Sequence, residues 1–320
     1  MPDSSRTGDR GIERRGTVIR LAGTLAAAAT VALLLPLAAA AQQRDEGWNA
    51  FAAVTPIAET STDLDQGGEV SADGVIARFG FSADLGGGLR AGLGFNYDYF
   101  DYTFTNPVAF GGVAPWGALK RYGVSAPLQY RVSPEWMLGV TPSADWFREN
   151  GAQTSDALAW GAVFSAVRLF PDGNRTGLGL GVYDQIEDTS VFPFLIVDWR
   201  LGERWRLTNP LPSGPTGGAG FEIDYEFGGG WSLGVGFTFR QYRFRLSENG
   251  PVPDGIGEQR GRPVFLRGTY AFSPAVALHL YAGVVTAGKL VVEDRNGNLV
   301  REDDLDNVAP LFALTLVGRF

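Results

Sequence analysis

The last twelve residues of the chain, 309–320, alternate strictly, and this alternation limits the fold more than any other feature of the sequence. One set of alternate positions is apolar apart from a glycine and consists of Phe312, Leu314, Leu316, Gly318 and Phe320. The other set is mixed and consists of Ala313, Thr315, Val317 and Arg319. Because successive side chains of a β-strand point to opposite faces, the segment predicts a strand with one apolar and one partly polar face. Such a strand fits a membrane-spanning barrel or the last strand of a soluble sandwich.

The same alternation recurs along the chain from residue 48 onward, most clearly in 231–239. The apolar positions there are Trp231, Leu233, Val235, Phe237 and Phe239, separated by glycine, serine and threonine. After Gln241 the parity slips, so that Tyr242, Phe244 and Leu246 form the apolar set, and we expect a β-bulge at this point. Repeated segments of this kind predict an all-β protein.

Short turns and longer polar connections follow each other regularly between these segments. Six short turns contain Gly, Pro or Asx residues, and seven connections are longer. Together these connections join fourteen predicted strands. The longer connections are 59–69, 105–117, 149–156, 184–190, 212–218, 247–261 and 293–308. A miscount by one hairpin gives twelve or sixteen strands. Short turns on one side and long loops on the other are typical of transmembrane barrels, and both chain ends then lie on the short-turn side.

The amino-terminal segment has the pattern of a secretory signal. Five arginines precede an apolar stretch at 21–37, and the alanines at 38–41 offer cleavage sites after small residues. We therefore predict a signal peptide over 1–41 and one mature domain over 42–320.

Composition narrows the class further. The mean hydropathy of −0.02 excludes a bundle of membrane helices, whose spans are continuously apolar. The net charge of −8 argues against a nucleic-acid partner. The absence of cysteine suits a closed barrel, in which the ladder itself holds the chain together.

The alternation, the turn pattern and the terminal Phe320 together resemble the bacterial outer-membrane β-barrel class, including porin-like channels. The resemblance implies a closed antiparallel transmembrane barrel of about fourteen strands, with short periplasmic turns and longer extracellular loops. It also implies that the protein contacts outer-membrane lipid, and that barrel-assembly machinery reads the C-terminal strand ending at Phe320.

Polar residues opposite the apolar positions are candidates for lining the lumen. The candidates are Arg121, Arg131, Arg206, Glu222, Asp224, Glu226, Arg240, Arg243, Arg245, Arg267, His279 and Arg319. Three acids share one strand, at Glu222, Asp224 and Glu226, and bases lie on the strands before and after it. Cross-strand pairing brings such groups within reach. They form either a charged wall for passing solutes or structural ion pairs that fill a narrow interior.

Nothing in the sequence favours catalysis, and we predict no enzyme activity, cofactor or metal. The single histidine, His279, lies on the lumen side with no serine within two residues on that face, so a local Ser–His pair is absent. Glycines at 177, 179 and 181 alternate within a strand, which leaves one face bare instead of building a phosphate loop.

The favoured function is therefore an outer-membrane channel that passes small solutes of unknown identity through a charged lumen. The alternatives are a barrel whose acidic extracellular loops bind a partner or surface, and, less favoured, a lipid-modifying enzyme. Two loop predictions accompany this hypothesis. The 105–117 segment, with Phe110, Pro115 and Trp116, is apolar enough to fold inward as a constriction or to bind an apolar solute at the mouth. Asn296-Gly297 predicts a type I′ hairpin that extends beyond the membrane.

Overall fold

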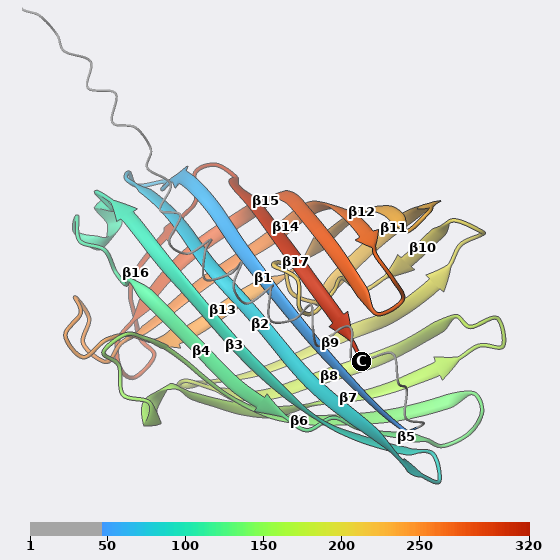
Figure 1. Ribbon diagram of the computed structural model, residues 1–320. Helices are drawn as coiled ribbons and strands as arrows, with labels where there is room; N and C mark the ends of the chain where they lie inside the picture. Colours follow the sequence, from blue (N-terminus) through green and yellow to red (C-terminus); the bar gives the residue numbers. More distant parts are fainter. Residues whose placement is uncertain (1–46) are drawn as a thin grey trace, which may run out of the picture.

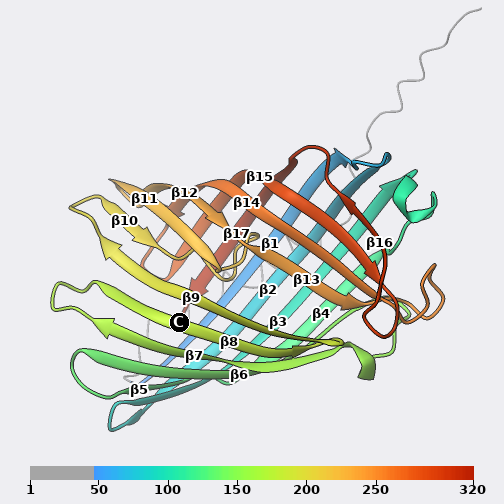
Figure 2. The same ribbon diagram turned by 180° about the vertical axis from the view of Figure 1, so that it is seen from behind.

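The computed structural model describes residues 47–320, which form one closed antiparallel β-barrel (Figures 1 and 2). The predicted signal peptide lies outside these residues. The sheet closes because β1 pairs with β17 and β9 pairs with β10. The strands are β1 (Trp48–Asp63), β2 (Glu69–Gly86), β3 (Leu89–Thr105), β4 (Ala118–Ser125), β5 (Leu128–Arg131), β6 (Trp136–Glu149), β7 (Leu158–Leu169), β8 (Arg175–Gln185), β9 (Asp188–Arg200), β10 (Trp205–Thr208), β11 (Gly220–Gly228), β12 (Trp231–Thr238), β13 (Arg240–Arg245), β14 (Ile256–Ala271), β15 (Val276–Glu293), β16 (Leu299–Asp304) and β17 (Ala309–Arg319).

These seventeen segments make fourteen wall strands, which confirms the predicted number. β4 and β5 both pair with β3 and β6, so they are one strand interrupted before Leu128. β12 and β13 share the partner β14, and β16 and β17 share β15. No helix in residues 47–320 is long and apolar enough to cross a membrane.

The outer face of the wall is apolar, as the alternation predicted. On β12, Leu233, Val235 and Phe237 are 43–49% exposed, whereas Gly234 and Gly236 on the opposite face are buried. We call the end with the short turns, where β1 begins and β17 ends, the turn end, and the opposite end the loop end. Exposed apolar side chains around a closed ladder are what a bilayer requires.

The interior at the loop end is filled by a hydrophobic cluster that joins opposite walls. Trp116 and Phe110 are 2% and 5% exposed, and Trp116 packs edge-on against Phe244 at 5.1 Å between ring centroids. A 3-10 turn at Val108–Phe110 carries the loop inward. The prediction that the 105–117 segment folds inward is confirmed, because Phe110 and Trp116 belong to this cluster.

The predicted β-bulge at Gln241 is wrong. The register of β12 and β13 against β14 continues unchanged from Phe237–Val264 to Arg240–Gly261, so no residue is inserted. Tyr242 and Phe244 consequently face inward and pack against the opposite wall. Tyr242 and Phe244 are apolar because the interior is apolar at this end of the barrel. Arg243 and Arg245, which alternate with them, therefore lie on the outer face and not on the lumen face as predicted.

The connections predicted at 184–190 and 212–218 differ in the structure. The expected 184–190 connection is a tight tip formed by Ile186 and Glu187, because β8 and β9 stay paired to Gln185–Asp188. The loop between β10 and β11, residues 209–219, folds into the barrel instead of outward, and it is called the lumen loop below. The Thr55 hydroxyl on β1 donates to the Ser213 carbonyl at 2.8 Å, and the Thr238 hydroxyl on β12 donates to the Thr216 carbonyl at 2.9 Å.

The last hairpin extends as a ribbon at the loop end, as predicted. Residues 289–293 of β15 pair with β16, and the turn between them runs through Asn296 and Gly297. Of these two, only Gly297 has a positive φ, at 82°, so the turn is not type I′, which needs two such residues. The chain closes a longer turn instead, with the Asp294 amide donating to the Asn298 carbonyl at 2.8 Å.

Candidate functional site

The barrel wall has a gap in its hydrogen-bond ladder beside β9. The short β10 pairs with β9 only from Asp198 to Arg200, so the rest of that β9 edge has no strand beside it. On the far side of the gap lie the start of β11 and the strand β13. At the loop end the β8–β9 tip closes the gap, because Arg243 Nε donates to the Ile186 carbonyl at 2.8 Å. We call this enclosed gap the wall window.

Pro193 and Asn209 reduce the number of unpaired backbone groups on the open edge of β9. The Val197 amide, which donates to Asn209 Oδ1 at 2.9 Å, shows that odd-numbered residues of β9 direct their backbone groups into the window. Pro193 shares this parity and has no amide hydrogen to leave unpaired. Asn209 Nδ2 donates to the carbonyls of Leu195 and Gly220 at 3.0 and 2.9 Å, so one side chain ties β9 to β11. These backbone groups of β9 are therefore satisfied without a further strand beside them.

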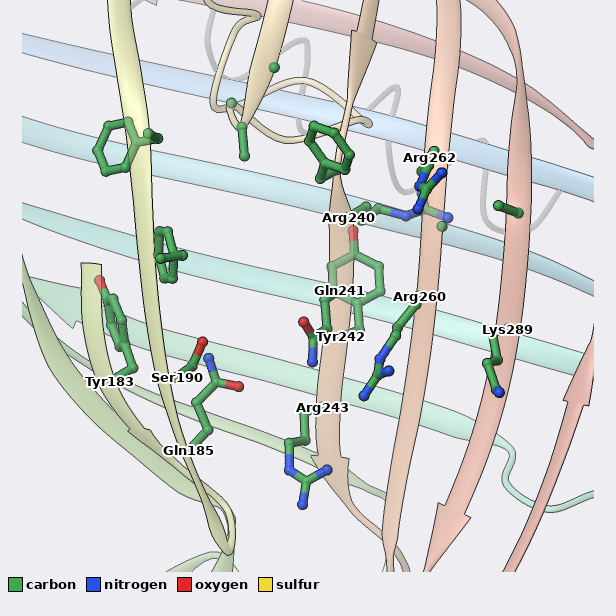
Figure 3. A pocket seen from close by; sticks show the side chains of 18 of the residues that line it. Tyr183, Gln185, Ser190, Arg240, Gln241, Tyr242, Arg243, Arg260, Arg262 and Lys289 are labelled. Carbon is green, nitrogen blue, oxygen red and sulfur yellow. The ribbon is translucent and has the colours of Figure 1, made fainter. Parts of the chain in front are cut away.

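A cavity of about 1280 Å³ lies behind and through the wall window (Figure 3). Its lining includes inward-facing residues such as Phe147 and Tyr242, and also Phe239, which is 60% exposed on the outer face. The inner part of this cavity is called the lumen chamber below. Because both faces of the wall line one space, the lumen chamber opens sideways.

The hydrophobic cluster closes the lumen chamber toward the loop end, and the lumen loop crosses the barrel on the other side. Both ends of the lumen loop, at Asn209 and at Gly218, line the cavity. In its middle, Ser213 and Thr216 are 7% and 1% exposed. The loop therefore stands between the lumen chamber and the turn end.

One side of the lumen chamber is aromatic and is built by glycines. Phe192 and Phe194 on β9 pair with Gly181 and Gly179 on β8, and a Cβ at either glycine would collide with the paired ring. Tyr183 stacks on Phe192 with 6.0 Å between ring centroids and 9° between planes. The bare glycine face predicted for β8 is thus occupied by aromatic rings.

The opposite side of the lumen chamber carries charge. Arg121 Nε donates to Asp145 Oδ1 at 3.0 Å, and its Nη1 lies 3.9 Å from Asp98. Asp98 also pairs with Arg78, so the charges alternate across four strands. Arg240 pairs with Glu59 on β1, which is not a neighbouring strand, so this ion pair spans the lumen.

A second charged group lies nearer the turn end. Arg267 donates to Glu222 at 2.6 Å and to Asp224 at 2.8 Å. β12 lies between these partners, and Gly234 on it leaves the space that the two carboxylates occupy. The acids of β11 therefore pair with a base two strands away. Arg206 lies directly opposite Asp224, as expected, but its ion pair is with Asp198 at 2.7 Å.

Arg243 and Arg245 lie on the face of β13 opposite to Tyr242 and Phe244, because alternation continues unbroken through Gln241. Arg243 pairs with Glu258 and Glu293 at 3.0 and 2.7 Å, outside the lumen. Arg245 lies 3.3 Å from Glu187 of the β8–β9 tip. Our placement of these two arginines in the lumen is wrong. They contact the β8–β9 tip, which forms the loop-end rim of the wall window.

The remaining candidates lie toward the turn end. Arg131, Glu226 and Arg319 are exposed there, and Arg131 donates to the Pro134 carbonyl at 2.9 Å. His279 is buried, and its Nδ1 shares a 2.8 Å hydrogen bond with the Thr269 hydroxyl. In residues 47–320 no group of three His, Asp or Glu side chains could hold a metal ion.

Sequence reasoning missed Glu59, Arg78 and the aromatic side of the lumen chamber. Alternation within strands would have shown Arg78 and Phe194 to face inward. Pairing across the lumen, as between Glu59 and Arg240, has no local signal. The lumen loop had one: residues 207–219 contain no charged side chain, a feature shared among the long connections only by 105–117, which also folds inward.

No protein-family model and no curated protein matches this sequence. Among solved structures, the chain is similar to the COG4313 outer membrane channel from Pseudomonas putida F1, with a TM-score of 0.44 and 11% identity over 87% of this chain and 97% of that one. It is also similar to the Pseudomonas putida toluene transporter TodX, with a TM-score of 0.41 and 10% identity over 86% and 90% of the two chains. For the KdgM porin the TM-score is 0.35, with 10% identity over 84% and 99%. The closed fourteen-stranded barrel with an apolar outer face is itself the fold of outer-membrane β-barrels.

Proposed function

We propose that this protein is an outer-membrane channel through which small solutes pass by way of the lumen chamber. Residues 1–41 serve as its export signal and the strand ending at Phe320 as its assembly signal. The observation that supports the proposal most is the cavity of about 1280 Å³, which continues from the lumen to the outer face through the wall window. A purely structural barrel of this size has no need of such a space.

The route has one gate. The hydrophobic cluster closes the axis at the loop end, so solutes enter the lumen chamber sideways. The lumen loop then separates the chamber from the turn end, and the loop must move for a solute to reach the periplasm. The hydrogen bonds that Thr55 and Thr238 donate to the middle of the loop hold it in the closed position.

Bilayer conductance of the purified protein tests this function. The natural chain is compared with a variant in which residues 211–217 are replaced by Gly-Ser-Gly. We expect brief, small openings from the natural chain and a conductance several-fold larger from the variant. Folding of both proteins is checked by heat-modifiable migration on gels. A correctly folded variant that conducts no ions and passes no solute into liposomes would exclude a channel.

The β15–β16 ribbon supports a second candidate, a barrel that binds a partner through its loop end. The ribbon projects beyond the fourteen wall strands and carries Asp294, Glu302 and Asp304. Shortening the ribbon by removing residues 291–302 should abolish binding to a partner cell surface and leave conductance unchanged. Loss of conductance without loss of binding would reject this candidate.

A further inference from the structure

The lumen chamber and the wall window carry an excess of basic side chains. The lining contains six basic residues, which are Arg121, Arg240, Arg243, Arg260, Arg262 and Lys289, but only two acidic ones, Asp145 and Asp304. Most of the bases have a carboxylate partner outside the lining. In residues 47–320, however, no ion pair or side-chain hydrogen bond involves the Arg262 guanidinium, which lies on the outer rim. Within this part of the chain, Arg262 therefore offers an unpaired positive charge to an anion at the wall window.

Arg240 is the basic residue best placed to hold a ligand in the lumen chamber. Its side chain is 4% exposed, and a single carboxylate, that of Glu59, faces it. Its Nη1 meets the Glu59 carboxylate, whereas its Nη2 is buried without a hydrogen-bond partner in residues 47–320, and the side chain lines the cavity (Figure 3). A guanidinium has five donors, and buried donors in folded proteins are normally satisfied. This pattern indicates that Arg240 offers donors to an anion in the chamber.

The aromatic side of the chamber determines what the anion is attached to. The rings of Phe192 and Phe194 lie 6.2 Å apart between centroids, and Tyr183 stacks on the first. This surface is already in place because the rings fill the space above Gly181 and Gly179. It offers offset stacking and apolar contact, which a small hydrophilic anion cannot use.

We propose that the lumen chamber binds an amphipathic carboxylate, with the carboxylate on Arg240 and an aromatic or short alkyl body against Phe192 and Phe194. The whole cavity, chamber and window together, has a volume of about 1280 Å³, larger than ordinary small-molecule sites, so one such body fits together with its hydration. The wall window lets the apolar body enter from the membrane while Arg262 on the outer rim attracts the charge. The inference deepens the proposed channel function by naming the class of its solute.

Equilibrium binding tests the inference without requiring transport. The full mature protein in lipid nanodiscs is titrated by calorimetry with 4-phenylbutyrate, its neutral amide and acetate. We expect saturable binding of 4-phenylbutyrate, binding of the amide that is about tenfold weaker because the charge-assisted hydrogen bonds are lost, and no measurable binding of acetate. Equal affinity for the acid and the amide would overturn the proposal, as would acetate binding as tightly as 4-phenylbutyrate.

Variants assign the two halves of the site. Arg240→Gln combined with Glu59→Gln removes the ion pair without leaving a buried charge, and it should weaken 4-phenylbutyrate about tenfold and leave the amide unchanged. Phe194→Ala should weaken both ligands. The matched control is Arg206→Gln with Asp198→Asn, an ion pair outside the chamber lining, which should change neither.

The results separate this inference from the channel itself. If the Arg240 variant does not fold, the comparison of acid with amide on the natural chain and on Phe194→Ala still decides. An unchanged 4-phenylbutyrate affinity in the folded Arg240 variant would overturn the assignment. Conductance without 4-phenylbutyrate binding rejects the solute class and retains the channel, whereas binding without conductance or flux rejects the channel and retains the site.

Discussion

The Thr55 hydroxyl donates a hydrogen bond of 2.8 Å to the Ser213 carbonyl, although the two residues are 158 positions apart. Thr55 Oγ1 also lies 2.8 Å from Thr315 Oγ1. Because a hydroxyl has one hydrogen, Thr315 is the donor in the second bond. The closing seam of the barrel, where β1 meets β17, thus supplies the anchor for the lumen loop.

We predict that Thr55→Val loosens the lumen loop. The change leaves the Ser213 carbonyl and the Thr315 hydroxyl buried without their partner, which costs about 1–3 kcal/mol of loop docking. Single-channel recording should show longer or more frequent openings at unchanged open-state conductance. Thr103→Val is the control, because Thr103 is exposed on β3 and makes no side-chain hydrogen bond within residues 47–320. Identical recordings from Thr55→Val and the natural chain would show that this contact does not hold the gate.

We predict that Asn209→Ala widens the wall window and lowers the stability of the barrel. Three backbone groups, on Val197, Leu195 and Gly220, lose the side chain that satisfies them. The free energy of unfolding in urea should fall by about 2–4 kcal/mol, since each buried backbone group left unpaired costs about 1–3 kcal/mol and some find water. Hydrogen exchange of the Val197 amide should accelerate.

The control for Asn209 is Asn307→Ala. The Asn307 side chain is exposed at the loop end, and its one side-chain hydrogen bond within residues 47–320 is to its neighbour Asp306, at 3.3 Å. It should leave both unfolding and exchange unchanged. Retention of full protection at Val197 in Asn209→Ala would mean that β9 is held by its pairing with β8 alone.

The overall architecture was predictable from sequence because a two-residue period reports which face of a strand meets lipid. Strands such as β12 show it plainly, and fourteen strands follow from counting turns. The interior was less predictable, because its contacts join residues far apart in the chain. Tyr242 and Phe244 illustrate the difference: their apolar character was read as contact with lipid, but it reflects a core inside the barrel.

Ion pairing was harder to predict than position. Glu222, Asp224 and Arg267 were all assigned to the lumen, and all three meet there. Their pairing across β12 depends on Gly234, whose missing side chain has no signature of its own among the many strand glycines. Register together with the residue on the intervening strand decides which charges meet, and neither can be read from one strand.

We predict that Gly234→Ala disrupts this charged group. A Cβ at Gly234 would meet the carboxylates of Glu222 and Asp224, which have to move away from Arg267. Breaking a buried pair costs about 3–5 kcal/mol, so the folded fraction or the unfolding midpoint in urea should fall clearly. Gly268→Ala on β14 is the matched control, because nothing lies within 4 Å of the added Cβ. Equal stability of the two variants would show that the carboxylates shift at no cost.

The last prediction concerns Asp303 in the ribbon, outside the barrel wall. Burial is the main cause that raises the pKa of this carboxyl above its ordinary value, and the nearby Asp65 adds to the effect. Its Oδ1 accepts from the Gln66 amide at 3.2 Å, whereas its Oδ2 is buried without a partner. A carboxyl with a raised pKa stabilises the docked ribbon when it is protonated, and this contribution disappears as the pH rises through the folded-state pKa.

Acidification should therefore tighten the contact between the β1–β2 turn and the ribbon, and Asp303→Asn should reproduce the effect at pH 7. The amide keeps the acceptor for Gln66 and removes the buried negative charge. Hydrogen exchange of the Gln66 amide, corrected for its intrinsic pH dependence, should be slower in the variant at pH 7 and equal in both proteins at pH 3. Asp306→Asn, at an exposed neighbouring position, should change neither value. Faster exchange in Asp303→Asn at pH 7 would show that the ionised carboxylate holds the turn, with the opposite dependence on pH.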